Sequence, residues 1–135
     1  MYSFKSKIRV RYSDTDQMGF VYYGVYAQYF EVGRVEFFRS LSISYKELEM
    51  KGFSFPVVHM NVDYKKPAFY DDIIIVNTSV NKISSVRINF SYETLNLQND
   101  ILNTAEVILV CYDKKNKKAC AIPDYIINKI KKIVK

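Results

Sequence analysis

YSDTDQMGFVYY, the stretch at residues 12–23, holds two acids, a glycine and an aromatic pair, and its surroundings decide the fold. It follows residues 4–12, where apolar and basic side chains alternate as in a half-buried strand. It precedes residues 22–41, whose apolar side chains recur with the period of an amphipathic helix. Asp14 and Asp16 are therefore predicted to lie in a loop that leads from a strand into the N-terminus of a long helix.

Such a loop can supply the two groups needed to break an acyl bond, a carboxylate and free backbone N–H groups. The first N–H groups of a helix have no partner within the helix and carry partial positive charge. They can hold a carbonyl oxygen and stabilise the negative charge that develops on it. A carboxylate beside them can act as base or nucleophile. On spacing alone, capping of the helix is the commoner use of an acid such as Asp16, so both roles stay open.

Size and composition predict one globular domain over residues 1–135, with 49% hydrophobic and 25% charged residues. The net charge of +6 is concentrated near the C-terminus, because residues 114–135 hold eight lysines and one acid. This pattern favours a solvated tail, and the alternative is a docking surface for phosphates or for an acidic partner. We expect no nucleic-acid binding.

The remaining composition argues against several other classes. Cys111 and Cys120 lack metal-ligand spacing, and with the single His59 they predict no metal site and no disulfide. The N-terminus lacks the apolar stretch of a signal peptide, and no run approaches the ~20 apolar residues of a membrane span. We therefore expect a cytoplasmic protein without integral membrane association. Phosphate loops of the P-loop or Rossmann type are also missing from the sequence.

The rest of the chain predicts an α+β fold. A short helix is expected at residues 44–51, with Ser44 as its N-cap, and a small C-terminal helix at 123–135. Short polar turns join the last three strands, so these should form an antiparallel meander. A sheet must wrap the long helix to cover its apolar face, and Gly33 would allow a close approach. The four strand candidates after the helices are residues 53–64, 73–83, 86–97 and 101–112.

Within the long helix, one stripe is expected to run through Val25, Tyr29, Val32 and Glu36, and Glu36 can pair with Arg39. The residues beside it complete a wide apolar face, and they are Tyr26, Phe30, Gly33, Phe37 and Leu41. Glu31 lies about two turns after Tyr23, on a part of the helix that we expect to be buried. A buried carboxylate is costly unless it is paired, so Glu31 should either pair with Arg34 or contact water or an acyl group.

Two motifs carry a resemblance to a known family. The first is specific and consists of Tyr12, Asp14-Thr15-Asp16, Gly19, Val21-Tyr22, Tyr26, Glu31 and Arg34. The second is weaker and mostly structural, and it consists of Pro56-Val57-Val58, Tyr64, Pro67-Ala68 and Asp71-Asp72. On these residues the chain resembles the hot-dog fold acyl-CoA thioesterases over roughly residues 7 to 127. It looks most like the branch that holds 4-hydroxybenzoyl-CoA thioesterase and the small thioesterases found with the Tol–Pal system.

This resemblance implies a hot-dog fold, an antiparallel five-stranded sheet wrapped around a long central helix. It implies hydrolysis of an acyl-CoA thioester to a carboxylic acid and CoA, with CoA as part of the substrate and no cofactor. Asp16 would be the base or nucleophile, and the backbone N–H of Tyr23 the oxyanion donor. A homodimer, often paired into a homotetramer, would carry the sites at subunit interfaces. Acyl carrier protein could replace coenzyme A as the carrier.

Further residues are candidates for substrate binding. Gly19, which suits a positive φ or a close ligand approach, and Val21 belong to the loop motif. Glu31 and the lone His59 are weaker candidates, since a single strand histidine is more often structural. The cations that could meet the phosphates of coenzyme A are Lys65, Lys66, Lys82 and Arg87.

Two other functions stay open. The first is a hot-dog hydratase or dehydratase, and the absence of a histidine near Tyr23 argues against it, because such enzymes usually place a histidine in the site. Many Tol–Pal relatives also carry a histidine at the position of Tyr23, so the substrate preference can differ from theirs. A non-catalytic acyl-thioester binding protein would share the fold without turnover. Asp14 is expected to be structural, and the nearby charge of Asp16 would raise its pKa.

Overall fold

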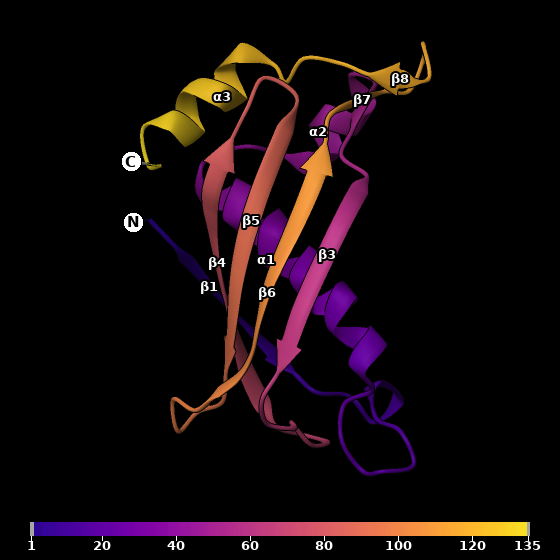
Figure 1. Cartoon of the computed structure of the whole chain (residues 1–135), viewed down its shortest axis with the longest axis vertical. Helices are drawn as coiled ribbons and strands as arrows, with labels where there is room; N and C mark the ends of the chain where they lie inside the picture. The colour runs from indigo at the N-terminus through magenta and orange to yellow at the C-terminus, as the bar shows by residue number, and fades with distance from the viewer. Residues whose placement is uncertain (1, 135) are drawn as a thin grey trace.

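A five-stranded antiparallel sheet with one long helix lying across it dominates the computed structural model, which describes residues 2–134 (Figure 1). All four neighbouring strand pairs run antiparallel. The predicted α+β hot-dog architecture is thus confirmed. The strands, in their order across the sheet, are β1 (Phe4–Arg9), β4 (Ile73–Ile83), β5 (Arg87–Leu95), β6 (Ile101–Val110) and β3 (Val57–Tyr64).

The long helix begins as a 3₁₀ turn, η2 (Tyr23–Val25), and continues as α1 (Tyr26–Ser40). The helix lies against β1 and β4, and its buried Phe30 and Phe37 contact Tyr92 and Phe90 of β5 to form the core. A Cβ atom built on Gly33 would lie 2.5 Å from Thr78 Oγ1 and 3.0 Å from Val76 Cγ1. The predicted close approach at Gly33 is therefore confirmed, because a Cβ at this position would clash with side chains of β4.

The predicted apolar face of α1 is confirmed at Phe30, Gly33 and Phe37, which are buried. It is wrong at Val32, which is 40% exposed, and at Glu36, which is only half-buried. The sheet covers one side of the helix only, so a valine on the opposite side stays in contact with solvent (Figure 1). The expected ion pair between Glu36 and Arg39 forms on the surface.

The predicted strands agree with the structure except at their ends. The meander of β4, β5 and β6 forms as expected, and Pro56 divides the first candidate into β2 (Phe53–Ser54) and β3. A second sheet, in which β2 pairs with β7 (Tyr112–Asp113) and β7 with β8 (Lys118–Ala119), was not predicted. Its two-residue strands are too short to show an alternating pattern.

The first strand also ends earlier than expected, at Arg9 rather than at residue 12. The chain then forms a 3₁₀ turn, η1 (Tyr12–Asp14). The reason is local, because the Asp14 carboxylate accepts the backbone N–H of Arg11 at 3.1 Å and closes the turn.

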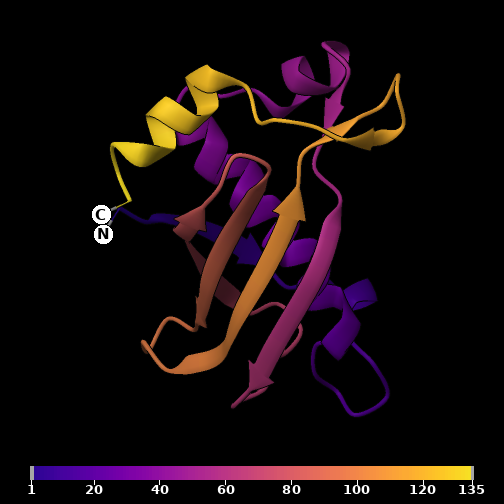
Figure 2. The same ribbon diagram turned by 45° about the horizontal axis from the view of Figure 1, so that its top comes forward.

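The remaining helices gather at one end of the sheet and the acidic loop lies at the other (Figures 1 and 2). In α2 (Tyr45–Met50) the Ser44 side chain accepts the N–H of Glu47, as the predicted N-cap requires. The helix α3 (Asp124–Lys131) packs Ile126 and Ile130 into the core. Within residues 2–134, no helix is long and apolar enough to cross a membrane.

Candidate active site

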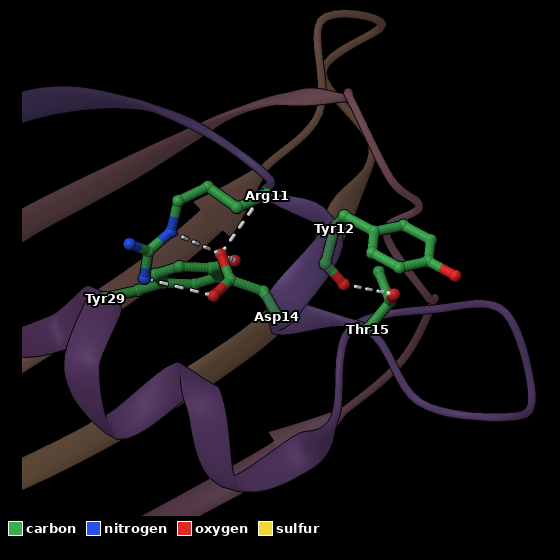
Figure 3. Close-up of polar contacts among 5 residues, drawn as sticks. All are labelled: Arg11, Tyr12, Asp14, Thr15 and Tyr29. Carbon is green, nitrogen blue, oxygen red and sulfur yellow. Dashed lines mark hydrogen bonds and ion pairs between the residues drawn. The ribbon is translucent and has the colours of Figure 1, made fainter.

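Asp14 anchors the acidic loop to the rest of the fold (Figure 3). Its side chain is buried, and Oδ2 accepts hydrogen bonds from the Tyr29 hydroxyl at 2.8 Å and from the Arg11 N–H at 3.1 Å. The Arg11 guanidinium lies 3.2 Å from Oδ1. The Asp14 carbonyl accepts the N–H of Tyr22 at 3.0 Å. These contacts support the structural role predicted for Asp14, since they join the loop to α1 and to the start of η2.

The predicted rise in the pKa of Asp14 is wrong. Burial raises this pKa, but the hydrogen bonds from Tyr29 and Arg11 and the charge of Arg11 together lower it below its ordinary value of 3.8. Donors that favour the carboxylate outweigh its desolvation. Asp14 is therefore a fixed anion, already occupied by its partners.

Asp16 has a different environment in the same loop. It is half-buried, and Oδ1 accepts the N–H of Met18 at 2.9 Å. Its backbone closes a tight turn with Phe20 and Gly19, whose φ of +89° confirms the predicted need for glycine. Among the described residues no donor bonds to Oδ2 of Asp16. This oxygen is available to a substrate or a water molecule.

The helix N-terminus presents free donors beside this carboxylate. Tyr22 N–H is bound to Asp14 and Val25 N–H to the Tyr22 carbonyl, at 2.9 Å in the second case. For residues 2–134, neither Tyr23 N–H nor Gly24 N–H has an acceptor in the protein. The Tyr64 hydroxyl donates to the Tyr23 carbonyl at 3.0 Å and so holds this turn against the end of β3.

Asp16 and Tyr23 line the same pocket, which has a volume of about 490 Å³. The loop reaches this position because Val21 N–H bonds to the Ala68 carbonyl at 2.9 Å, so the two motifs of the sequence lie side by side. The pocket contains the predicted residues Val21, Lys65 and Lys66, and Gly19 lies in the turn that bounds it. Sequence reasoning missed its other walls, which are Met18, Phe20, Tyr26, Tyr64 and Pro67.

Aromatic side chains dominate these walls. The Tyr64 ring centroid lies 5.8 Å from that of Tyr26 and 6.5 Å from that of Tyr23. Burial raises the pKa of the Tyr26 phenol to about 12, with smaller contributions from Tyr64 and Asp72, so it stays protonated at neutral pH. Tyr64 and Pro67 belong to the second sequence motif, which is the signal that could have identified them.

Four predicted substrate-binding residues lie away from this pocket in the single chain. Glu31 is exposed rather than buried, and it lines a separate hollow of about 670 Å³ between α1 and α2. Its predicted ion pair with Arg34 does not form within the described chain, because Arg34 donates instead to the Tyr92 hydroxyl at 3.4 Å.

The other three are placed by the sheet. His59 is exposed on β3, five residues before Tyr64, which is roughly 16 Å along a strand. Lys82 and Arg87 line a third hollow at the β4–β5 hairpin. That hairpin lies at the end of the sheet opposite the acidic loop (Figure 1).

Comparisons with known proteins agree with this geometry. The family profile described as "Thioesterase-like superfamily" matches residues 10–130. The Acyl-CoA thioester hydrolase YbgC of Escherichia coli is 34% identical over 128 residues, which cover 95% of this chain and 96% of the relative.

Solved structures show the same similarity. That of DHNA-CoA thioesterase from Staphylococcus aureus has a TM-score of 0.94 and 34% identity, and the match covers 98% of this chain and 91% of that one. That of Slr0204, a 1,4-dihydroxy-2-naphthoyl-CoA thioesterase from Synechocystis, has a TM-score of 0.87 and 25% identity, with 96% of each chain covered. The chain belongs to the thioesterase-like superfamily.

Proposed function

We propose that this protein hydrolyses an acyl-CoA thioester to a carboxylic acid and free coenzyme A. The observation that carries the proposal is that Asp16 and Tyr23 line one pocket, and that the Tyr23 N–H has no acceptor among residues 2–134. Relatives aligned over nearly the full chain are named as acyl-CoA thioester hydrolases.

The proposed chemistry needs only this carboxylate and these donors. The thioester carbonyl oxygen accepts the Tyr23 N–H, and the field of the helix N-terminus stabilises the developing oxyanion. Asp16 either takes a proton from the attacking water or attacks the carbonyl carbon itself, forming an anhydride that water then hydrolyses. In both routes the C–S bond breaks, the sulfur leaves with the electron pair, and it takes up a proton to give the thiol of coenzyme A.

The walls of the pocket favour an apolar acyl group with a ring. Phe20, Tyr26 and Tyr64 surround a volume large enough for a bicyclic aromatic group, and aromatic pairs prefer such edge and offset contacts. Two relatives of known structure are named as thioesterases of DHNA-CoA or of 1,4-dihydroxy-2-naphthoyl-CoA. A medium aliphatic acyl chain is the second candidate, because the same walls are apolar.

One of the two lysines at this pocket is free to bind a phosphate of coenzyme A. Lys66 lies 3.6 Å from Asp100 in an ion pair, whereas Lys65 has no ion pair with any described residue. We assign to Lys65 the contact with a phosphate of coenzyme A. Acyl carrier protein, whose prosthetic arm also carries a phosphate, is the alternative carrier.

The proposed working unit is a homodimer, with pairing of dimers into a homotetramer as the larger form. The strand β3 is an uncovered sheet edge with exposed apolar side chains at Val57, Val58 and Met60. An unpaired edge of eight residues is a template for another strand. Two-fold symmetry makes the two β3 strands antiparallel and extends the sheet across both chains.

Free-thiol release from an acyl-CoA panel, measured for wild type and Asp16→Asn together, tests the proposal. The panel holds short, medium and long aliphatic esters and one aromatic ester. We expect release by wild type and a loss of kcat of about 100- to 10,000-fold in the variant. Asn keeps the oxygen that accepts the Met18 N–H, so the melting temperature should stay unchanged.

Other outcomes favour the rival functions. Hydrolysis by Asp16→Asn at the wild-type rate would exclude the proposed mechanism. Binding of acyl-CoA without release by either protein would support a non-catalytic binding protein. Hydration of an enoyl-CoA without thiol release would support a hydratase.

A further inference from the structure

Cys111 and Cys120 face each other at the base of the β7–β8 hairpin, far from the Asp16 pocket in the fold. The register pairs Tyr112 with Ala119, so these cysteines form the next opposed pair of the same two strands. Cys120 N–H donates to the Cys111 carbonyl at 2.9 Å, and the two Sγ atoms are 3.4 Å apart. Both are free thiols. We propose that this pair is a redox modification site, which a low-molecular-weight disulfide converts into an intrachain disulfide.

The backbone already has the geometry that a disulfide needs. A disulfide requires Cα atoms about 4.4–6.8 Å apart, and directly opposed residues of an antiparallel pair lie about 4.5–5.5 Å apart. The Cys111 carbonyl and Cys120 N–H fix this pairing. Rotation of the side chains is therefore enough to bring the sulfurs into bonding distance, and no strand has to move.

The two thiols differ in access, which sets the order of reaction. Cys111 is completely buried, and burial followed by its contact with Cys120 raises its pKa to about 12. Its Sγ lies 3.7 Å from the Ala121 carbonyl, which accepts its weak hydrogen bond. Cys120 is half-buried and is the thiol that a solute reaches first.

The reaction is a two-step thiol–disulfide exchange. Cys120 thiolate attacks one sulfur of the oxidant, the S–S bond of the oxidant breaks, and the first small thiol leaves and takes up a proton. Cys111 sulfur then attacks Sγ of Cys120, and the mixed disulfide between Cys120 and the second half of the oxidant breaks. The second small thiol leaves with the electron pair of that bond and takes up the proton that Cys111 loses. The cysteine pair loses two electrons, and the oxidant gains them as two thiols. Proximity compensates for the low thiolate fraction of Cys111.

The surrounding charge favours an anionic oxidant such as oxidised glutathione. The turn between the two cysteines carries lysines at positions 114, 115, 117 and 118, and a single acid, Asp113, precedes them. Lys114 is 3.9 Å from Glu49, which is a weak pair, and the other three have no ion pair among residues 2–134. Their positive field raises the local concentration of an anion.

The disulfide would stabilise the β7–β8 hairpin and the second sheet to which it belongs. The hairpin is bound to the α2–β2 segment through Lys114 N–H and the Gly52 carbonyl, and through the pairing of β2 with β7. A covalent link across the base of the hairpin restricts the unfolded chain and keeps these strands paired.

Digestion after lysine tests the proposal directly on the full chain. The protein is treated with oxidised glutathione, its free thiols are alkylated, and it is cleaved with an endoproteinase specific for lysine. We expect residues 83–114 and 119–129 to be recovered as one linked pair of peptides, which dithiothreitol separates. Alkylation of both cysteines after oxidation would overturn the proposal, and so would a disulfide between two chains.

Two variants check the order of reaction. Cys111→Ser should retain glutathione on Cys120, whereas Cys120→Ser should leave the buried Cys111 unmodified. Equal glutathionylation of both variants would contradict the assigned roles.

The thermal stability provides a second readout. Oxidation should raise the melting temperature of wild type by roughly 5 to 10 °C, as expected for closing a loop of about ten residues. The melting temperature of Cys120→Ser should not respond to the oxidant. An oxidised wild type that melts at the same temperature as the reduced protein would refute the stabilising role.

Discussion

Asp14 and Asp16 lie in the same loop, but they have different roles because they have different hydrogen-bond partners. Asp14 is buried and accepts bonds from Tyr29 and Arg11, whereas Asp16 is half-buried and has one oxygen that no residue between 2 and 134 donates to. Donors that saturate a carboxylate hold it as a fixed anion, and a free oxygen beside a pocket can take part in a reaction. The loop thus keeps one acid for structure and offers the other to the proposed substrate.

The bond from Tyr29 to Asp14 should be visible in the stability. Tyr29→Phe is expected to lower the free energy of unfolding at pH 7 by about 2 kcal/mol, because it removes a donor from a buried charge. The pKa of Asp14 is lowered by folding, so its contribution is complete above pH ~3.8 and is lost as the pH falls through the folded value. The deficit of the variant should therefore shrink at acid pH.

Urea unfolding at pH 7 and near pH 3 measures this difference. Tyr12→Phe is the matched control, since Tyr12 is 78% exposed and should change stability by less than about 0.5 kcal/mol. A deficit that stays the same at both pH values would show that the Asp14 charge is not involved.

The Tyr64 hydroxyl should affect kcat for thioester hydrolysis. Tyr64→Phe removes the hydrogen bond to the Tyr23 carbonyl, which helps to orient the adjoining N–H groups. If such a bond is worth about 1 kcal/mol, kcat for thioester hydrolysis should fall about 5-fold, with KM little changed. Steady-state kinetics beside Tyr70→Phe, an exposed tyrosine of the following loop, tests this expectation. Equal kcat values for wild type and Tyr64→Phe would rule out the positioning role.

At the scale of elements, the close contact of α1 with the sheet depends on Gly33. Gly33→Ala should lower stability by about 2 kcal/mol, although alanine favours a helix by about 1 kcal/mol. The reason is the 2.5 Å distance from the new Cβ to Thr78 Oγ1, which forces the helix off the sheet. Thr78→Ala in the same protein should restore part of the loss.

Denaturant unfolding of these variants provides the measurement. Gln28→Ala is the control on the exposed side of the same helix and should remain within about 0.5 kcal/mol of wild type. Unchanged stability of Gly33→Ala would mean that the helix can withdraw from the sheet at no cost.

The elements that the sequence predicts well are those with long, regular patterns. The meander of β4, β5 and β6 follows from alternation between clear polar turns, and Ser44 marks the start of α2. The two-residue strands of the second sheet leave no pattern, so they could not be predicted.

The residues of the site that lie in one sequence motif could be predicted, whereas those that the fold brings in from elsewhere could not. Asp16, Val21 and Tyr23 follow one another in a specific motif, and they share a pocket. Tyr64 reaches that pocket only because β3 lies beside β6, a pairing that sequence spacing does not reveal. The placement of Glu31 on an exposed surface depends on which side of α1 the sheet leaves open.

At the scale of the whole molecule, the exposed edge β3 predicts the assembly. Met60→Asp places a charge on this edge and should convert the proposed dimer into a monomer of 15.9 kDa. Light scattering after size-exclusion chromatography measures the mass. Leu97→Asp, at an exposed leucine of the β5–β6 turn, should keep the mass of wild type. A Met60→Asp protein with twice the chain mass would exclude this edge as the interface.

The order of the strands also constrains how the protein is made. During synthesis α1 leaves the ribosome before β4 and β5, the strands that contact its buried side chains. The strand β3 also emerges before its only neighbour in the sheet, β6. The nascent chain must therefore carry an uncovered apolar helix until about residue 95 has been translated, and an unpaired β3 until about residue 110. Chaperones that bind apolar segments are therefore expected to bind α1 and β3 in the nascent chain.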